Sequence, residues 1–155
     1  MKLIIGSDHL AYEMKEKIKH FLETQTYVDI NEVYDAGVYS SDPVDYPDIA
    51  EKVAKRIAEG DFDRGILICG TGIGMAIAAN KVPGVRAAQV YDPYTAERAR
   101  KSNNAQIMTL GALTMGSATA EYLVRLWLLS EFAHGRSERK VEKINLIDKA
   151  YKKEI

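Results

Sequence analysis

Cysteine and histidine are scarce in this sequence. Its 155 residues include one cysteine, Cys69, and three histidines. A single cysteine forms neither an intrachain disulfide nor a multi-cysteine metal site, and three scattered histidines do not indicate a metal centre. We therefore expect no metal and no disulfide framework, and this cysteine usage is typical of a cytoplasmic protein.

Long apolar runs and an excess of charge are also missing. No hydrophobic run reaches the roughly 18 residues of a membrane-spanning helix, and the start, MKLIIGSDH, turns polar too soon for a signal peptide. The 21 basic and 22 acidic residues give a net charge of −1, so no overall field attracts nucleic acid or an anionic membrane. We expect neither as a partner.

The length and composition are those of one globular domain. A chain of 155 residues has the usual size of a single domain, and 46% hydrophobic residues are enough to build a core. We therefore expect residues 1–155 to form one domain.

Short β-branched runs alternate with amphipathic stretches along the chain, a pattern that predicts βαβ units and a parallel sheet. Five strands are expected, at residues 2–6, within 28–34, and at 65–69, 85–90 and 107–110. The helices between them begin after residue 8, near 46, at the glycine turn 70–74 and at 92–93, and the third of them runs through 79. A long apolar helix at 114–129 and a tail helix at about 137–152 follow. The fold class is α/β.

Open parallel sheets bind ligands at the carboxyl ends of their strands, where the loops converge. Asp8 and His9 follow the first strand, the segment 69–74 follows the third, and the turn 91–93 follows the fourth. We therefore expect these segments to share one rim of the sheet, which is where the chemistry should lie.

A glycine-rich turn, Gly70-Thr71-Gly72-Ile73-Gly74, directly follows the buried third strand. Such a turn lets backbone N–H groups approach an oxyanion. It lacks the last glycine of G-x-G-x-x-G and the GK[ST] of a P-loop, so nucleotide binding is not indicated. An oxyanion site at this turn is the hypothesis that remains.

Cys69 has two interpretations. A cysteine at a strand end is often a small buried hydrophobic residue. Its position before a helix N-terminus supports a second role, because such a position lowers a thiol pKa and increases the thiolate fraction near pH 7. Asp8 likewise is either an N-cap or a site carboxylate, and His9 either a first-turn residue or a ligand-binding one.

The tail helix has a basic start and an apolar stripe. Arg136 and Lys140 are four residues apart, so they lie on one helical face and together can hold a phosphate. The alternative is an ordinary solvated face. The stripe is too apolar for a free tail, so we expect it to pack on a second copy of the chain; it comprises Val141, Ile144, Ile147 and Tyr151.

Several segments in order along the chain resemble the ribose-5-phosphate isomerase B and galactose-6-phosphate isomerase family. They are GSDH (6–9), DYPD (45–48), ICGTGIGMAIAANKVPGVRAA (68–88), NN (103–104) and GRSERKVEKI (135–144). The resemblance implies a three-layer α/β/α sandwich with a five-stranded, Rossmann-like parallel sheet and a protruding C-terminal helix. It also implies metal-independent and cofactor-independent aldose–ketose isomerisation of a sugar phosphate.

The resemblance also implies catalytic roles at positions that match the family motifs. Cys69 corresponds to the base that transfers the proton, and Asp8 to the residue that contacts sugar hydroxyls and the ring oxygen. The enediolate would be stabilised by Thr71 together with the amides of the turn, namely those of Gly70, Gly72 and Gly74.

Substrate binding is implied for residues on two parts of the chain. His9, Arg136 and Lys140 would hold the phosphate, and Tyr46 and Asn103 would contact the sugar. The family implies a homodimer or a tetramer of dimers in which the tail helix and the Asn103 loop reach the site of a neighbouring subunit.

Four positions depart from the family pattern. Ser102 stands where the ribose-5-phosphate enzymes have a ring-opening histidine, Leu113 and Lys140 each replace an arginine, and Ser137 replaces a histidine. A lysine lacks the bidentate grip of an arginine. The expected substrate is of the ribose 5-phosphate type.

Two alternatives remain open at this point. A tetrose 4-phosphate such as erythrulose 4-phosphate cannot close a furanose ring through its phosphorylated oxygen, so it would need no ring-opening group. A subunit of a galactose-6-phosphate isomerase-like complex, with a binding role and no catalysis of its own, is the other.

Overall fold

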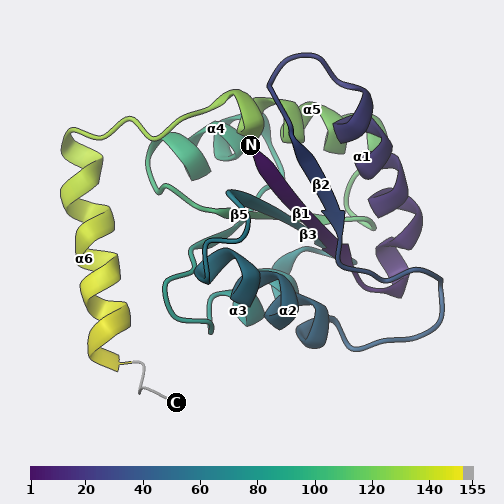
Figure 1. Ribbon diagram of the computed structural model, residues 1–155, viewed down its shortest axis with the longest axis horizontal. Helices are drawn as coiled ribbons and strands as arrows, with labels where there is room; N and C mark the ends of the chain where they lie inside the picture. Colours follow the sequence, from purple (N-terminus) through teal and green to yellow (C-terminus); the bar gives the residue numbers. More distant parts are fainter. Residues whose placement is uncertain (152–155) are drawn as a thin grey trace.

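The computed structural model describes residues 1–151, which contain a five-stranded parallel sheet of order β2-β1-β3-β5-β4 (Figure 1). The strands are β1 (Lys2–Ser7), β2 (Glu32–Asp35), β3 (Arg64–Cys69), β4 (Ala87–Gln89) and β5 (Ile107–Gly111). All six residues of β3 are buried, as expected for the central strand of a sheet covered on both faces.

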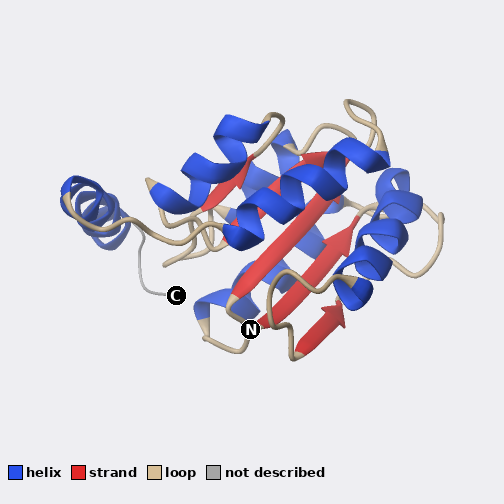
Figure 2. Ribbon diagram, turned by 90° about the horizontal axis from the view of Figure 1, so that it is seen from above, coloured by secondary structure: helices blue, strands red, loops and turns tan. Residues whose placement is uncertain are grey.

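Helices cover both faces of the sheet (Figure 2). One core cluster packs α1, α4 and α5 on one face, and a second packs α2 and α3 on the other. The helices are η1 (His9–Ala11, a 3₁₀ turn), α1 (Tyr12–Thr24), α2 (Tyr46–Ala58), α3 (Ile73–Ala79), α4 (Pro93–Lys101), α5 (Ser117–Leu129) and α6 (Arg136–Tyr151). The expected three-layer α/β/α sandwich is confirmed.

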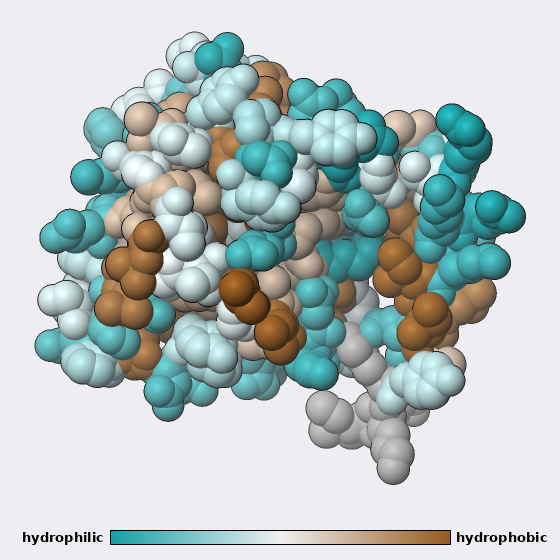
Figure 3. Space-filling view, turned by 180° about the vertical axis from the view of Figure 1, so that it is seen from behind, coloured by the Kyte–Doolittle hydropathy of each residue, from teal (hydrophilic) through white to brown (hydrophobic). Residues whose placement is uncertain are grey.

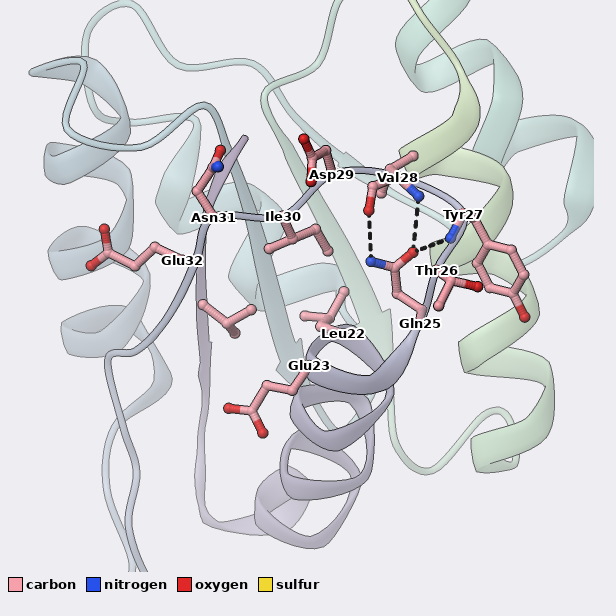
Figure 4. Close-up of a pocket in the computed structure, with 11 residues that line it drawn as sticks. Leu22, Glu23, Gln25, Thr26, Tyr27, Val28, Asp29, Ile30, Asn31 and Glu32 are labelled. Atoms are coloured by element: carbon pink, nitrogen blue, oxygen red, sulfur yellow. Dashed lines mark hydrogen bonds between the residues drawn. The ribbon is translucent and has the colours of Figure 1, made fainter.

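The second strand begins within the expected range 28–34, at Glu32, and ends one residue beyond it, at Asp35. Residues 28–31 belong to a loop that the Gln25 side chain holds together, since its Nε2 donates to the Val28 carbonyl and its Oε1 accepts from the amides of Tyr27 and Val28 (Figure 4). A groove of about 640 Å³ lies along this loop, and no candidate site residue lines it. Only 32–35 pair with β1.

The helix expected from residue 114 begins three residues later, at Ser117. Gly116 has extended backbone angles and precedes the first helical turn. The Thr114 amide and hydroxyl instead bond to the Gly111 carbonyl, which closes a tight turn after β5. This turn keeps the loop after β5 close to the end of the neighbouring strand.

Helix α6 stands apart from the sheet, as expected for a protruding helix (Figure 1). It begins at Arg136 and is described to Tyr151; residue 152, the expected end, lies outside the described residues. Two hydrogen bonds tie it to the loop before β4: Arg86 donates to Asn145 at 2.9 Å, and the Gly84 amide donates to Asp148 at 2.6 Å.

The apolar stripe of α6 is only partly covered by its own chain. Val141 is buried, whereas Ile144 and Ile147 are exposed and Tyr151 is 84% exposed. Figure 3 shows hydrophobic side chains along α6 beside the main body of the molecule. None of the described helices is long and apolar enough to cross a membrane.

Candidate active site

The turn that follows β3 lies at the carboxyl edge of the sheet and is held by the loops of both neighbouring strands. The Asp8 amide donates to the Ile68 carbonyl at 3.2 Å. On the other side, the amides of Ala112 and Leu113 donate to the carbonyls of Cys69 and Gly70 at 2.8 and 2.9 Å. The loops after β1, β3 and β5 therefore meet at one rim.

The Cys69 thiol is fixed inside this turn. Its side chain is 5% exposed, and its Sγ accepts a hydrogen bond from the Gly72 amide at 3.1 Å. Gly72 has φ +80°, and its backbone packs so closely on Leu110 that an added Cβ would lie 3.0 to 3.2 Å from three backbone atoms. Only glycine fits there without strain, and its amide then points at the sulfur.

Other amides of the turn are available to a ligand. Within the residues that the structure describes, the amides of Gly70, Thr71 and Gly74 have no hydrogen-bond partner. The Thr71 hydroxyl accepts from the Ile73 amide at 3.2 Å, so its own proton is free to be donated. The turn thus presents several donors beside one thiol, an arrangement suited to an oxyanion next to a base.

Asp8 and His9 stand at the end of β1, on the same rim. Asp8 is 5% exposed and accepts from the Ala11 amide at 3.2 Å; burial, the largest effect, raises the pKa of its carboxyl. The Nδ1 atom of His9 accepts from the Val44 amide at 3.2 Å. A neutral imidazole in that bond carries its proton on Nε2, which is therefore a donor.

Tyr46 reaches the turn from the first residue of α2. Its ring lies against Gly74, where an added Cβ would stand 2.5 Å from the Tyr46 Cζ atom. Gly74 is therefore small because the Tyr46 ring occupies the space of a side chain. The side chains of Leu10 and Leu113 flank Gly70 in the same way, within 3.2 to 3.6 Å of such a Cβ.

Asn103, Arg136 and Lys140 lie elsewhere. Asn103 precedes β5, so it stands at the amino edge of the sheet, whereas Cys69 ends β3 at the carboxyl edge. The length of β5 separates these edges by roughly 13 Å, at about 3.3 Å per residue. Helix α6 contacts the loop before β4, which is also at the amino edge. The single chain therefore does not bring these three residues to the thiol.

The structure adds residues that the motifs did not indicate. Arg98 lines one hollow with Arg136 and Lys140, and its guanidinium donates to Ser102 from both Nε and Nη2. Arg98 lies on α4 and Ser102, four residues later, is the C-cap of that helix; this spacing is the signal that could have indicated the pair. Leu10, which flanks Gly70, carried no such signal, whereas Leu113 was indicated only as a position where the family has an arginine.

Metal-ligating side chains do not gather anywhere in the described chain. Among residues 1–151, no group of three or more histidine, cysteine, aspartate or glutamate side chains has a geometry that could hold an ion. The arrangement at the carboxyl edge is instead a thiol, a buried carboxyl, an imidazole donor and free backbone amides. These groups suit proton transfer next to a carbon that bears oxygen.

Comparison with known proteins identifies the family. The family model described as Ribose/Galactose Isomerase matches residues 3–144. Ribose-5-P isomerase B of Listeria innocua is 51% identical over 148 residues, which cover 96% of this chain and 97% of that protein. D-erythrulose-4-phosphate isomerase of Pectobacterium atrosepticum is 46% identical over 144 residues, 93% of each chain.

A solved structure has the same fold throughout. The ribose-5-phosphate isomerase B of Clostridium thermocellum superposes with a TM-score of 0.93 at 46% identity, covering 98% of this chain and 100% of that one. The sequence resemblance and the expected fold are thereby confirmed. The chain belongs to the ribose/galactose isomerase family.

Proposed function

We propose that this chain is an aldose–ketose isomerase of a small sugar phosphate, of the ribose 5-phosphate/ribulose 5-phosphate type. The observation that carries the proposal is the Cys69 thiol, held by the Gly72 amide at 3.1 Å beside the free amides of Gly70 and Gly74. A base and a set of oxyanion donors in one turn are what proton transfer through an enediolate requires.

The reaction follows from these groups. The Cys69 thiolate removes the proton from C2 of the open-chain aldose, and the electrons of that C–H bond form the C1–C2 double bond while the C1 oxygen becomes negative. The amides of Gly70 and Gly74 and the Thr71 hydroxyl stabilise that oxygen. Cys69 then returns its proton to C1, and the hydroxyl proton of O2 passes to O1, which leaves a C2 ketone.

Two copies of the chain complete each site. The phosphate ligands Arg136 and Lys140 and the sugar ligand Asn103 lie at the amino edge, away from Cys69. Large apolar side chains are exposed on both surfaces that would meet: Leu10 and Leu113 beside Gly70, the latter 72% exposed, and Ile147 on α6. Surfaces of this kind mark protein interfaces. The proposed assembly is a homodimer or a pair of such dimers.

Mixing two inactive variants tests the shared site. At substrate concentrations far below KM, Cys69→Ala and Arg136→Ala proteins should each be nearly inactive alone, the first through kcat and the second through KM. In a mixed dimer one of the two sites combines an intact Cys69 with an intact Arg136, so unfolding and refolding the variants together should restore about one quarter of the normal activity. Absence of any recovery in a mixture that sedimentation shows to contain dimers would contradict the shared site.

A tetrose 4-phosphate is the second candidate substrate, and Ser102 is the observation that favours it. Serine is a poor acid near pH 7, so it does not protonate a ring oxygen, and a tetrose 4-phosphate needs no ring opening. Ser102 is also engaged by Arg98. The relative from Pectobacterium is named for such a substrate.

Turnover by the purified chain alone, measured with tetrose, pentose and hexose phosphates, decides between the candidates. A higher kcat/KM for ribose 5-phosphate than for erythrulose 4-phosphate supports the first. The reverse order supports the second, and Ser102→His should then raise activity on ribose 5-phosphate. No turnover of any of them, with binding retained, would mean a binding subunit that needs a partner chain.

The lone cysteine supports a cytoplasmic location.

A further inference from the structure

Basic side chains surround a hollow of about 680 Å³ between the end of α4 and the start of α6. Four of its lining residues are cationic and none is acidic: Arg98, Ser102, Gly135, Arg136, Ser137, Arg139 and Lys140. The hollow joins the tail helix to the turn before β5, so it lies at the amino edge of the sheet.

These four cations form no ion pair with the described part of the chain. No ion pair within residues 1–151 includes Arg98, Arg136, Arg139 or Lys140. Glu97 and Glu138, which adjoin Arg98 and Arg139 in the sequence, form their ion pairs with other residues: Glu97 with Lys101 at 2.8 Å and Glu138 with His134 at 3.1 Å. Cations gathered in this way favour a compact, multiply charged anion such as a phosphate.

Arg98 differs from the other three cations in how it is held. It belongs to α4, on the main body of the molecule, and both Nε, at 2.8 Å, and Nη2 donate to the Ser102 hydroxyl oxygen. Its Nη1 has no hydrogen-bond partner within the described residues. A guanidinium fixed on one side offers its remaining donors in a set direction, which reduces the ordering cost of binding an anion.

We propose that Arg98 is a phosphate-binding residue of this enzyme and that Ser102 is the residue that positions it. The proposal rests on the proposed function, because the phosphate that Arg98 binds belongs to the sugar whose C1 and C2 lie at Cys69 of a second copy. It gives Ser102 a task that is distinct from acid catalysis. The hydroxyl orients a guanidinium and touches no reacting atom.

Direct binding of inorganic phosphate to the full-length protein tests the proposal without reference to turnover. Arg98→Gln should weaken phosphate binding about tenfold or more, since a charged hydrogen bond is lost. Arg125→Gln is the matched control: it removes the same charge from an exposed arginine that lies over the Tyr27 ring, away from the hollow. Equal affinities of the two variants for phosphate would overturn the proposal.

The positioning role of Ser102 has its own readout. Ser102→Ala should raise KM for ribose 5-phosphate and erythrulose 4-phosphate with little change in kcat, because phosphate binding is uniform between ground and transition states. Ser102→Thr, which keeps the hydroxyl, should restore KM. A purely structural role would instead lower the thermal unfolding midpoint of Ser102→Ala without a selective change in KM.

The isomerase function and the role of Arg98 can be contradicted separately. Phosphate binding that depends on Arg98, in a protein that turns over no sugar phosphate, would support the role of Arg98 and contradict the isomerase function. Normal turnover with an unchanged KM in Arg98→Gln would support the isomerase function and contradict the role of Arg98. Circular dichroism confirms the folding of each variant, and Arg98→Lys, which keeps the charge without the fork, should lie between the two extremes.

Discussion

Cys69 is buried among apolar residues, and its sulfur also accepts a hydrogen bond from a backbone amide. Its surroundings therefore suit both a buried hydrophobic residue and a base. Replacing it separates them. Cys69→Ala should reduce kcat by at least about 10² and leave KM near normal, because a base acts in the transition state. Steady-state kinetics on a folded variant measure this. Unchanged kcat would rule out the role as base.

Asp8 carries a cost in stability at neutral pH. Burial raises the pKa of its carboxyl above the ordinary value of 3.8, so the folded state holds the proton more tightly than the unfolded chain. The stability that Asp8 contributes is therefore full below pH 3.8 and is lost as the pH rises through the higher folded pKa. Near neutral pH, the ionised carboxylate of Asp8 should therefore lower the stability of the folded protein, and we expect that its role in the active site explains its presence.

Asp8→Asn tests this directly. The amide oxygen still accepts from Ala11, so the variant should unfold at a higher temperature than wild type at pH 7, by an amount that shrinks toward pH 4, while activity falls. Thermal denaturation across that pH range measures the effect. Asp45→Asn, at an exposed carboxylate that makes no cap hydrogen bond, removes the same charge and is the control.

Gly74 has no side chain, and this leaves room for the Tyr46 ring. Gly74→Ala should leave stability unchanged or higher, because alanine favours a helix by about 1 kcal/mol, but its Cβ would displace the Tyr46 ring. We expect kcat/KM to fall about ten- to a hundredfold through this misplacement. In a Tyr46→Ala background the same change should have little further effect. Additive losses would show that Gly74 acts without Tyr46.

At the scale of elements, Asp35 joins β2 to α1. Lys15, fully buried, donates to both of its oxygens at 2.7 Å, and Lys19 donates at 3.0 Å. Burial by itself raises the pKa of Asp35, but the hydrogen bonds from Lys15, the Gly37 amide and Lys19 outweigh it and lower that pKa. The stability from Asp35 is thus present above pH 3.8 and is lost as the pH falls through the lower folded value.

Asp35→Asn removes the more buried of the two carboxylates that Lys15 and Lys19 share, and leaves them with Glu16. We expect it to lower the free energy of unfolding at pH 7 by about 3 kcal/mol, since breaking a buried pair is costly. Denaturant titration gives the value, and the difference from wild type should shrink in acid. Glu32 also belongs to β2 and forms an exposed pair with Lys2 of β1, so Glu32→Gln should cost less than about 1 kcal/mol. Equal losses would refute the buried network.

The order of the elements was predictable, whereas their ends were less so. β3 contains the uninterrupted apolar run 65–69, and α4 follows Asp92, whose side chain accepts from the Thr95 amide. Both signals are local in sequence. The start of β2 is not, because its position depends on Gln25 bonding to a loop that follows it and on pairing with β1.

At the scale of the whole molecule, the chemistry proposed here needs no metal. The residues that the structure describes offer no ligand cluster, and the turn after β3 supplies backbone donors for the enediolate. We expect full activity in excess EDTA and after dialysis against it. Activity that is lost with the chelator and returns with a divalent cation would show that a metal takes part.

The amino-acid sequence by itself determined the α/β class, the place of Cys69 before a glycine turn, and the family. These features depend on hydrophobic period, on glycine spacing and on motifs, all of which are local. The order of the strands also predicted that Asp8 and His9 share a rim with that turn. Tertiary structure alone decided that the Tyr46 ring packs on Gly74 of the turn, while Asn103 and Arg136 of the same chain lie away from it. The physical reason is strand direction. In a parallel sheet every strand places its two ends at opposite edges, so residues assigned to one active site can lie a full strand length apart in the same chain.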